Sequence, residues 1–213
     1  MVIVRSVPWW GVVSSAAAPV LLVCGWTIAA GLQPGSFDAV SRTISALAAQ
    51  GAADRWVMTL VLLGVGACDV LTGLALRPAT SAGRLILVAG GIAGMLVAAN
   101  PEPAGGEGSL AHGFWATLGF IALTAWPVAG ARREPSAPYG LQPAVSASAT
   151  AVMLGLLAWF SAELIAGLGQ AGLAERILAE TQALWPLAVV LTAAAQTRTQ
   201  TSAPGPAGAD IPD

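Results

Sequence analysis

Residues 56–76 read WVMTLVLLGVGACDVLTGLAL, and this stretch decides the fold. Asp69 is the only charged side chain in it. A helix that crosses the hydrocarbon core of a membrane needs about 20 predominantly apolar residues. The stretch therefore predicts a transmembrane helix.

Five further stretches, on both sides of this one, are apolar enough to be interpreted in the same way: residues 9–32, 85–99, 111–131, 144–169 and 177–195. The first is longer than a signal-peptide core, which favours a retained helix. The stretch 85–99 spans about 23 Å at about 1.5 Å per residue, so we expect its outer end to thin the bilayer locally or to pack under the following loop. We predict an all-α polytopic bundle of about six helices, formed by one membrane domain over residues 1–196.

The composition supports a membrane protein and argues against several other classes. Apolar residues make up 56% of the chain and charged residues 9%, whereas soluble domains carry about a quarter charged residues. The net charge is -2 and the nine cationic residues are scattered arginines, so we expect no nucleic-acid partner. Cys24 and Cys68 lie in apolar stretches, where we expect reduced packing residues, and we predict no metal or cofactor.

The arginines predict which ends of the helices face the cytoplasm. The face that carries both termini holds Arg5, Arg77, Arg84, Arg132, Arg133 and Arg198, whereas the other holds Arg42, Arg55 and Arg176. Because cytoplasmic loops carry an excess of arginine and lysine, we predict a multi-pass protein of the cell membrane with both termini in the cytoplasm. Residues 197–213 lack apolar periodicity and are predicted to be a disordered tail.

The segment 33–55 is too polar to span the membrane, yet its apolar residues recur at helical spacing. We expect a short interfacial helix there, with Asp38 accepting backbone N–H groups at its start. A second interpretation places Asp38, Ser41, Arg42 and Ser45 in a polar lid over the mouth of the bundle, with Arg42 paired to Asp38.

Apart from Glu180 in the first turn of the last one, two carboxyl groups fall inside predicted transmembrane helices, where an ionisable side chain is costly unless it is paired, protonated or facing a cavity. Glu163 follows Trp159 and Phe160 by about one helical turn, and desolvation by these rings favours a protonated acid. A bond to a neighbouring helix explains Glu163 equally well. For Asp69 we expect a hydrogen bond to a hydroxyl group such as that of Thr72, or to another helix.

More polar residues gather near the predicted outer ends of the helices. His112, the only histidine, opens one helix shortly after Glu107, and Trp115 follows one turn later. It is a candidate for handling protons or for a simple contact at the helix start. Glu180 and Trp185 lie in the last helix, where a glutamate in the first turn also stabilises the helix itself.

Three strings carry a family resemblance: SRTISALAAQG after the first helix, ANPEPAGGEGSLAH before the fourth, and GLAERILAETQALWPL at the last. Together they resemble the bacterial membrane family called domain of unknown function 998. The resemblance implies that the polar stretch from Asp38 to Ser45, His112, and the pair Glu175 and Arg176 recur in the family. It implies no chemistry.

Two functions from different classes remain open. One is a metal-independent enzyme that cyclises an apolar isoprenoid-type substrate, as small membrane terpene cyclases of similar architecture do. Glu163 would then supply the proton that starts the cyclisation. Asp38, Glu107 or Glu180 would remove the final proton, and His112 would handle protons. Trp115, Trp159, Phe160 and Trp185 would line the cavity, with Ser41 and Arg42 at its mouth. The alternative is a non-enzymatic lipid-binding, immunity or sensor protein. Neither interpretation fixes the oligomeric state.

Overall fold

The computed structural model describes residues 6–104 and 108–202, with side chains described as far as Thr197. All regular structure in this part of the chain is helical: α1 (Trp9–Gly31), α2 (Ser45–Ala48), α3 (Trp56–Ala75), α4 (Ser81–Ala99), α5 (Leu110–Gly130), η1 (Tyr139–Leu141), α6 (Pro143–Ala166) and α7 (Ala171–Ser202). Six of these helices, all except α2 and η1, are long and apolar enough to cross a membrane. The predicted all-α bundle is confirmed, and the chain is a multi-pass membrane protein.

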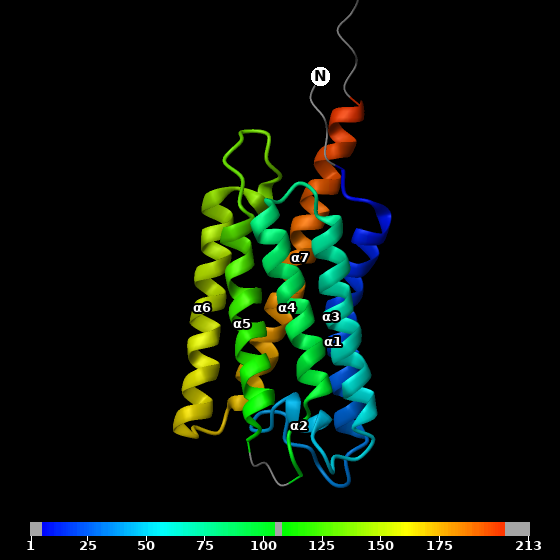
Figure 1. The fold of residues 1–213 in the computed structure, drawn as a ribbon, viewed down its shortest axis with the longest axis vertical. Coiled ribbons are helices and arrows are strands. Elements are labelled where there is room, and N and C mark those ends of the chain that lie inside the picture. Colours follow the sequence, from blue (N-terminus) through cyan, green and yellow to red (C-terminus); the bar gives the residue numbers. More distant parts are fainter. Residues whose placement is uncertain (1–5, 105–107, 203–213) are drawn as a thin grey trace, which may run out of the picture.

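The six long helices form a closed ring of neighbours. α1 packs against α3, α3 against α4, α4 against α5, α5 against α6 and α6 against α7, while α7 packs back against α1. Figure 1 shows the helices running nearly parallel, with α2 and its loops at one end of the bundle. The start of α1 and the end of α7 lie at the other end. We call the first of these the α2 end. Which side of a membrane it faces stays a prediction.

The third transmembrane helix starts earlier than predicted, because polar side chains at its start are bonded inside the protein. α4 starts at Ser81 instead of residue 85, since the Thr80 hydroxyl group accepts a hydrogen bond from the Gly83 N–H at 3.1 Å. Arg84 donates to the carbonyl oxygens of Gly73 and Leu74, so a charged residue fits in the first turn. The resulting 19 residues give about 28 Å, which nearly matches the hydrocarbon core and removes the expected need for thinning.

The last transmembrane helix is longer than predicted at both ends. α7 begins at Ala171, so Glu175 and Arg176 belong to the helix and not to a loop. It continues to Ser202, and the start of the predicted tail is therefore helical. Arg5 and residues 203–213 lie outside the described residues, as does the side chain of Arg198.

α3 and α4 approach each other closely at two glycines. A Cβ atom built on Gly91 would lie 2.5 Å from the carbonyl oxygen of Gly66, and one built on Gly66 would lie 2.5 Å from that of Gly91. Both contacts are with backbone atoms, which a rotamer change cannot relieve. Such small residues allow transmembrane helices to pack backbone against backbone.

We expect Gly91→Ala to lower the free energy of unfolding by about 1–3 kcal/mol, the usual cost of overpacking. Gly155→Ala in α6 is the matched control, because nothing lies within 4 Å of a Cβ atom there. The control should be neutral or slightly stabilising, since alanine favours a helix. Thermal unfolding of the two purified variants in detergent checks this, and equal melting temperatures would contradict the close packing.

Candidate functional site

A cavity of about 110 Å³ lies inside the ring of helices. α6 contributes no side chain to its wall, and most of the lining is apolar and small: Leu22 of α1; Leu62, Val65 and Gly66 of α3; Gly90, Gly94 and Val97 of α4; Ala116, Gly119, Phe120 and Leu123 of α5; Ala179 and Ala183 of α7; and Ile44. Four polar side chains also line it: Ser45, Asp69, Glu175 and Gln182. The sequence did not single out this combination.

Ile44 and Ser45 line the cavity at the α2 end, and we call residues 38–48, to which they belong, the roof segment. The first turns of α7 hold this segment in place. Arg176 Nη1 donates to the carbonyl oxygens of Ala39 at 2.8 Å, Arg42 at 2.9 Å and Gly172 at 2.8 Å. The Leu173 N–H donates to the carbonyl oxygen of Val40 at 2.9 Å. Arg176 therefore joins α7 to the roof segment.

Glu175, next to Arg176, is buried and faces both the roof segment and the cavity. Its Oε2 atom accepts a hydrogen bond from the Ile44 N–H, and its Oε1 atom lies 3.4 Å from the Ser45 hydroxyl oxygen. Because a hydroxyl group can donate or accept, the Ser45 contact fits both the ionised carboxylate and an acid protonated at Oε1. Glu175 therefore combines a place on the cavity wall with a geometry that tolerates a proton.

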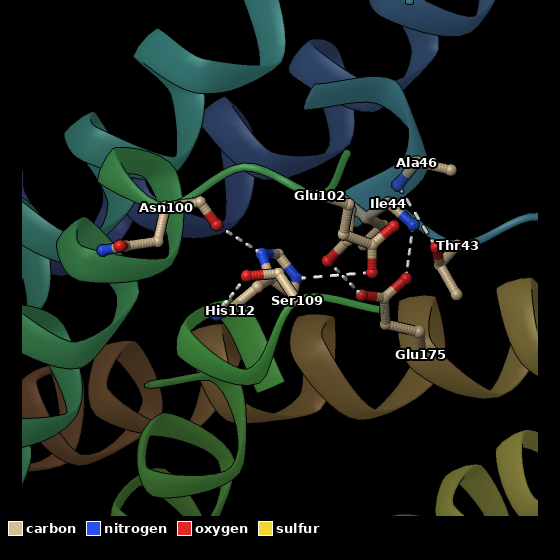
Figure 2. Close-up of polar contacts among 9 residues, drawn as sticks. Thr43, Ile44, Ala46, Asn100, Glu102, Ser109, His112 and Glu175 are labelled. Atoms are coloured by element: carbon tan, nitrogen blue, oxygen red, sulfur yellow. Dashed lines mark hydrogen bonds and ion pairs between the residues drawn. The ribbon is translucent and has the colours of Figure 1, made fainter. Parts of the chain in front are cut away.

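Glu102 and His112 form a second polar pair beside Glu175 (Figure 2). His112 Nε2 lies 3.6 Å from Glu102 Oε1, and His112 Nδ1 lies 2.9 Å from the carbonyl oxygen of Asn100. The Glu102 side chain is 27% exposed, whereas that of His112 is 7% exposed. The carboxyl groups of Glu102 and Glu175 interact electrostatically. The pair therefore lies between the solvent and the carboxyl group on the cavity wall.

The contacts of His112 also determine where its proton lies. A carbonyl oxygen can only accept, so Nδ1 must carry a hydrogen. The Nε2 atom of a neutral ring is then a bare acceptor, and it lies 3.6 Å from Glu102 Oε1, which is longer than a hydrogen bond.

We expect a neutral His112 to be the Nδ1–H tautomer. Because it is the only histidine, ¹⁵N-histidine labelling of the untagged protein gives one imidazole whose two nitrogen shifts report the tautomer. The Nδ1 atom contacts the backbone carbonyl oxygen of Asn100, so Asn100→Ala should keep this contact. Glu102→Ala should change the Nε2 signal. An Nε2–H tautomer in the wild type would contradict the geometry.

Asp69 lies in α3, is 4% exposed and lines the cavity. The expected hydrogen bond to Thr72 is not formed, because the Thr72 hydroxyl group pairs with that of Ser14 at 2.8 Å. In the part of the chain that the structure describes, no side chain or backbone group makes a hydrogen bond or an ion pair with the Asp69 carboxyl group. This carboxyl group faces the cavity without a partner.

Glu163 and its neighbours lie away from the cavity wall. Its carboxyl oxygens accept hydrogen bonds from the Trp159 indole N–H at 3.1 Å and from the Gln170 N–H at 2.8 Å. Both oxygens are thus occupied at the turn between α6 and α7. Phe160 is buried and packs edge-to-face on Phe120, at 5.4 Å between ring centroids, so it supports a cavity residue from behind.

The remaining predicted site residues are dispersed. Trp115 packs edge-to-face against Phe114, and Trp185 packs against the apolar cluster around Leu76 and Trp126. Neither these tryptophans nor Glu180 is among the residues that line the cavity. Glu107 lies outside the described residues.

Asp38, Ser41 and Arg42 lie in the exposed part of the roof segment. Asp38 accepts from the Ser41 hydroxyl at 2.7 Å and from the N–H groups of Val40 and Ser41, and these hydrogen bonds lower its pKa. Asp38 accepts backbone N–H groups as predicted, but it does so in a turn and does not cap the expected helix, because α2 begins only at Ser45 and has no side-chain cap. Arg42 does not form the predicted ion pair with Asp38 in the described chain. Its Cζ atom lies instead over the Phe37 ring, 4.6 Å from the ring centroid.

No group of three or more His, Cys, Asp or Glu side chains within residues 6–104 and 108–202 is arranged to hold a metal ion. The polar chemistry of the described site therefore comes from Glu175, Asp69, Gln182 and Ser45, with Glu102 and His112 behind Glu175.

The comparison with known families gives one match. A family model described as "Protein of unknown function (DUF998)" matches residues 16–192, which run from α1 into α7. This range includes the cavity, the roof segment and the pair of Glu102 and His112. No curated protein and no solved structure gives a significant match. The resemblance predicted from the sequence is confirmed, whereas the chemistry has to be inferred from the site.

Proposed function

We propose that this chain, which belongs to the family described as "Protein of unknown function (DUF998)", is an enzyme that rearranges an apolar, isoprenoid-type molecule by acid catalysis inside the membrane. The observation that carries the proposal is the apolar cavity with the buried carboxyl group of Glu175 on its wall. Its mostly apolar lining disfavours water, which would help to protect a cationic intermediate from being quenched.

Glu175 is the acid in this proposal, in place of the Glu163 favoured by the sequence. Its protonated carboxyl group donates to an alkene or epoxide, a ring closes, and the resulting cation loses a proton to a carboxylate. One proton enters and one leaves, so the reaction is an isomerisation that consumes no second substrate. Asp69, the other carboxyl group on the wall, is the candidate base.

Glu102 and His112 supply the route by which Glu175 regains its proton. His112 Nε2 lies 3.6 Å from Glu102 Oε1, the Glu102 side chain is partly open to solvent, and its carboxyl group interacts electrostatically with that of Glu175. We name them relay residues, since they act through Glu175 and not on the substrate.

The size of the cavity sets a condition on the substrate. A cavity of about 150 Å³ holds a benzene ring, so about 110 Å³ holds only part of a prenyl chain. The rest of the chain must lie between helices or under a displaced roof segment. The same geometry favours the second candidate, a non-enzymatic lipid-binding protein in which an apolar ligand moves the roof segment.

The test compares membranes that contain the wild type with membranes that contain Ala179→Phe, which fills the cavity. Both are incubated with farnesylated aromatic compounds, and the products are searched for an isomer of unchanged mass and changed retention time. Ala147→Phe, on the exposed side of α6, is the matched control. We expect an isomer from the wild type and the control only. Absence of any isomer with every prenylated compound would contradict the enzyme and leave the lipid-binding candidate.

A further inference from the structure

The buried carboxyl group of Asp69 makes no hydrogen bond or ion pair with any residue that the structure describes. Gly66 precedes it by almost one turn on the same helix, and Gly90 and Gly94 line the cavity from α4, so little side-chain bulk surrounds the carboxyl group. An ionised carboxyl group at membrane depth costs several kcal/mol when it is unpaired. A partner from outside the chain would remove this cost.

The other polar atoms on the cavity wall indicate which kind of partner fits. Gln182 is 1% exposed, and its Nε2 atom is occupied by the carbonyl oxygen of Phe120 at 3.0 Å and the Thr124 hydroxyl at 2.9 Å. Its Oε1 atom has no hydrogen-bond partner in the described chain. Gln182 Oε1 and an ionised Asp69 therefore offer acceptors only, and a ligand that binds both must bring the hydrogen atoms or the positive charge.

We propose that the cavity binds organic cations, namely ammonium groups carried on an apolar chain or ring, with Asp69 as the counter-ion. The Phe120 ring on the same wall favours this choice, because an aromatic face attracts a cation. The inference deepens the proposed function: an amine at this position imitates the carbocation that the reaction would form, so Asp69 would stabilise both.

The test measures the binding of two matched probes to the purified full-length protein by isothermal titration. One probe is geranyldimethylamine, and the other is the hydrocarbon in which a carbon atom replaces the nitrogen. We expect the amine to bind at least about tenfold more tightly to the wild type, which corresponds to about 1.4 kcal/mol. Asp69→Asn should remove this preference, and Asp69→Glu should retain much of it.

Two further variants keep the test decisive if Asp69→Asn does not fold. Ala179→Phe should lose binding of both probes, since it fills the cavity, whereas Glu163→Gln should keep the preference because Glu163 lies outside the wall. Equal affinity for the two probes, or a preference that survives Asp69→Asn, would overturn the inference. If the protein prefers the amine but converts no prenylated compound to an isomer, the proposed enzyme is overturned and the cation site stands. If it forms an isomer but does not prefer the amine, the cation site is overturned and the proposed enzyme stands.

Discussion

Glu175→Gln is expected to lower the rate of isomer formation by about 100-fold or more, the usual contribution of a general acid. Glutamine keeps the size of the side chain, and its amide oxygen can still accept the hydrogen bond from the Ile44 N–H. The roof segment should therefore stay in place while the transferable proton is lost. The measurement is the initial rate of product formation per amount of folded protein.

Glu163→Gln is the matched control for this variant. Glu163 is also a buried glutamate near the α2 end, but its two oxygens bind Trp159 and Gln170 at the turn between α6 and α7. We expect its rate to stay near that of the wild type. A rate that falls in Glu163→Gln and not in Glu175→Gln would return the acid to the residue that the sequence favoured.

Arg176→Leu is expected to lower the free energy of unfolding by about 3 kcal/mol, because one buried and two partly buried carbonyl groups lose a charged donor. The carbonyl oxygens of Ala39 and Arg42 belong to the roof segment, so this segment should detach first. Trypsin cleavage after Arg42, together with thermal unfolding in detergent, measures both effects.

Arg55→Leu is the control for Arg176→Leu, since Arg55 is exposed and directly precedes α3, which begins at the α2 end of the bundle (Figure 1). It should leave both the melting temperature and the cleavage rate near those of the wild type. If the two variants unfold alike and are cut alike after Arg42, Arg176 does not hold the roof segment.

Hydropathy was enough to predict the six transmembrane helices, because their apolar length follows from the thickness of the membrane. It failed at the start of α7, where Glu175 and Arg176 made the chain look like a loop. Their partners Ile44, Ala39 and Arg42 lie far away in the sequence, so no local pattern announces that these two side chains are buried and bonded.

The candidate site was only partly predictable for a similar reason. Asp69 was recognised as an unusual charge, but its direction depends on which helices surround α3. Gly66 and Asp69 lie on nearly one face of α3, and Gly90 and Gly94 lie in the neighbouring α4. This spacing was a signal that could have indicated a cavity wall without bulky side chains. Glu163 was favoured because Trp159 precedes it by one turn. The two side chains are hydrogen-bonded to each other, but the pair lies outside the cavity wall.

The measurement that tests the central claim most directly is photo-crosslinking of the wild type with a farnesyl probe that carries a diazirine group, followed by peptide mass spectrometry. If the cavity is the binding site, labels fall on wall residues such as Phe120 and Ala179, and Ala179→Phe loses them. Labels confined to Phe114, Leu118 and Ile121, on the exposed face of α5, would contradict the account.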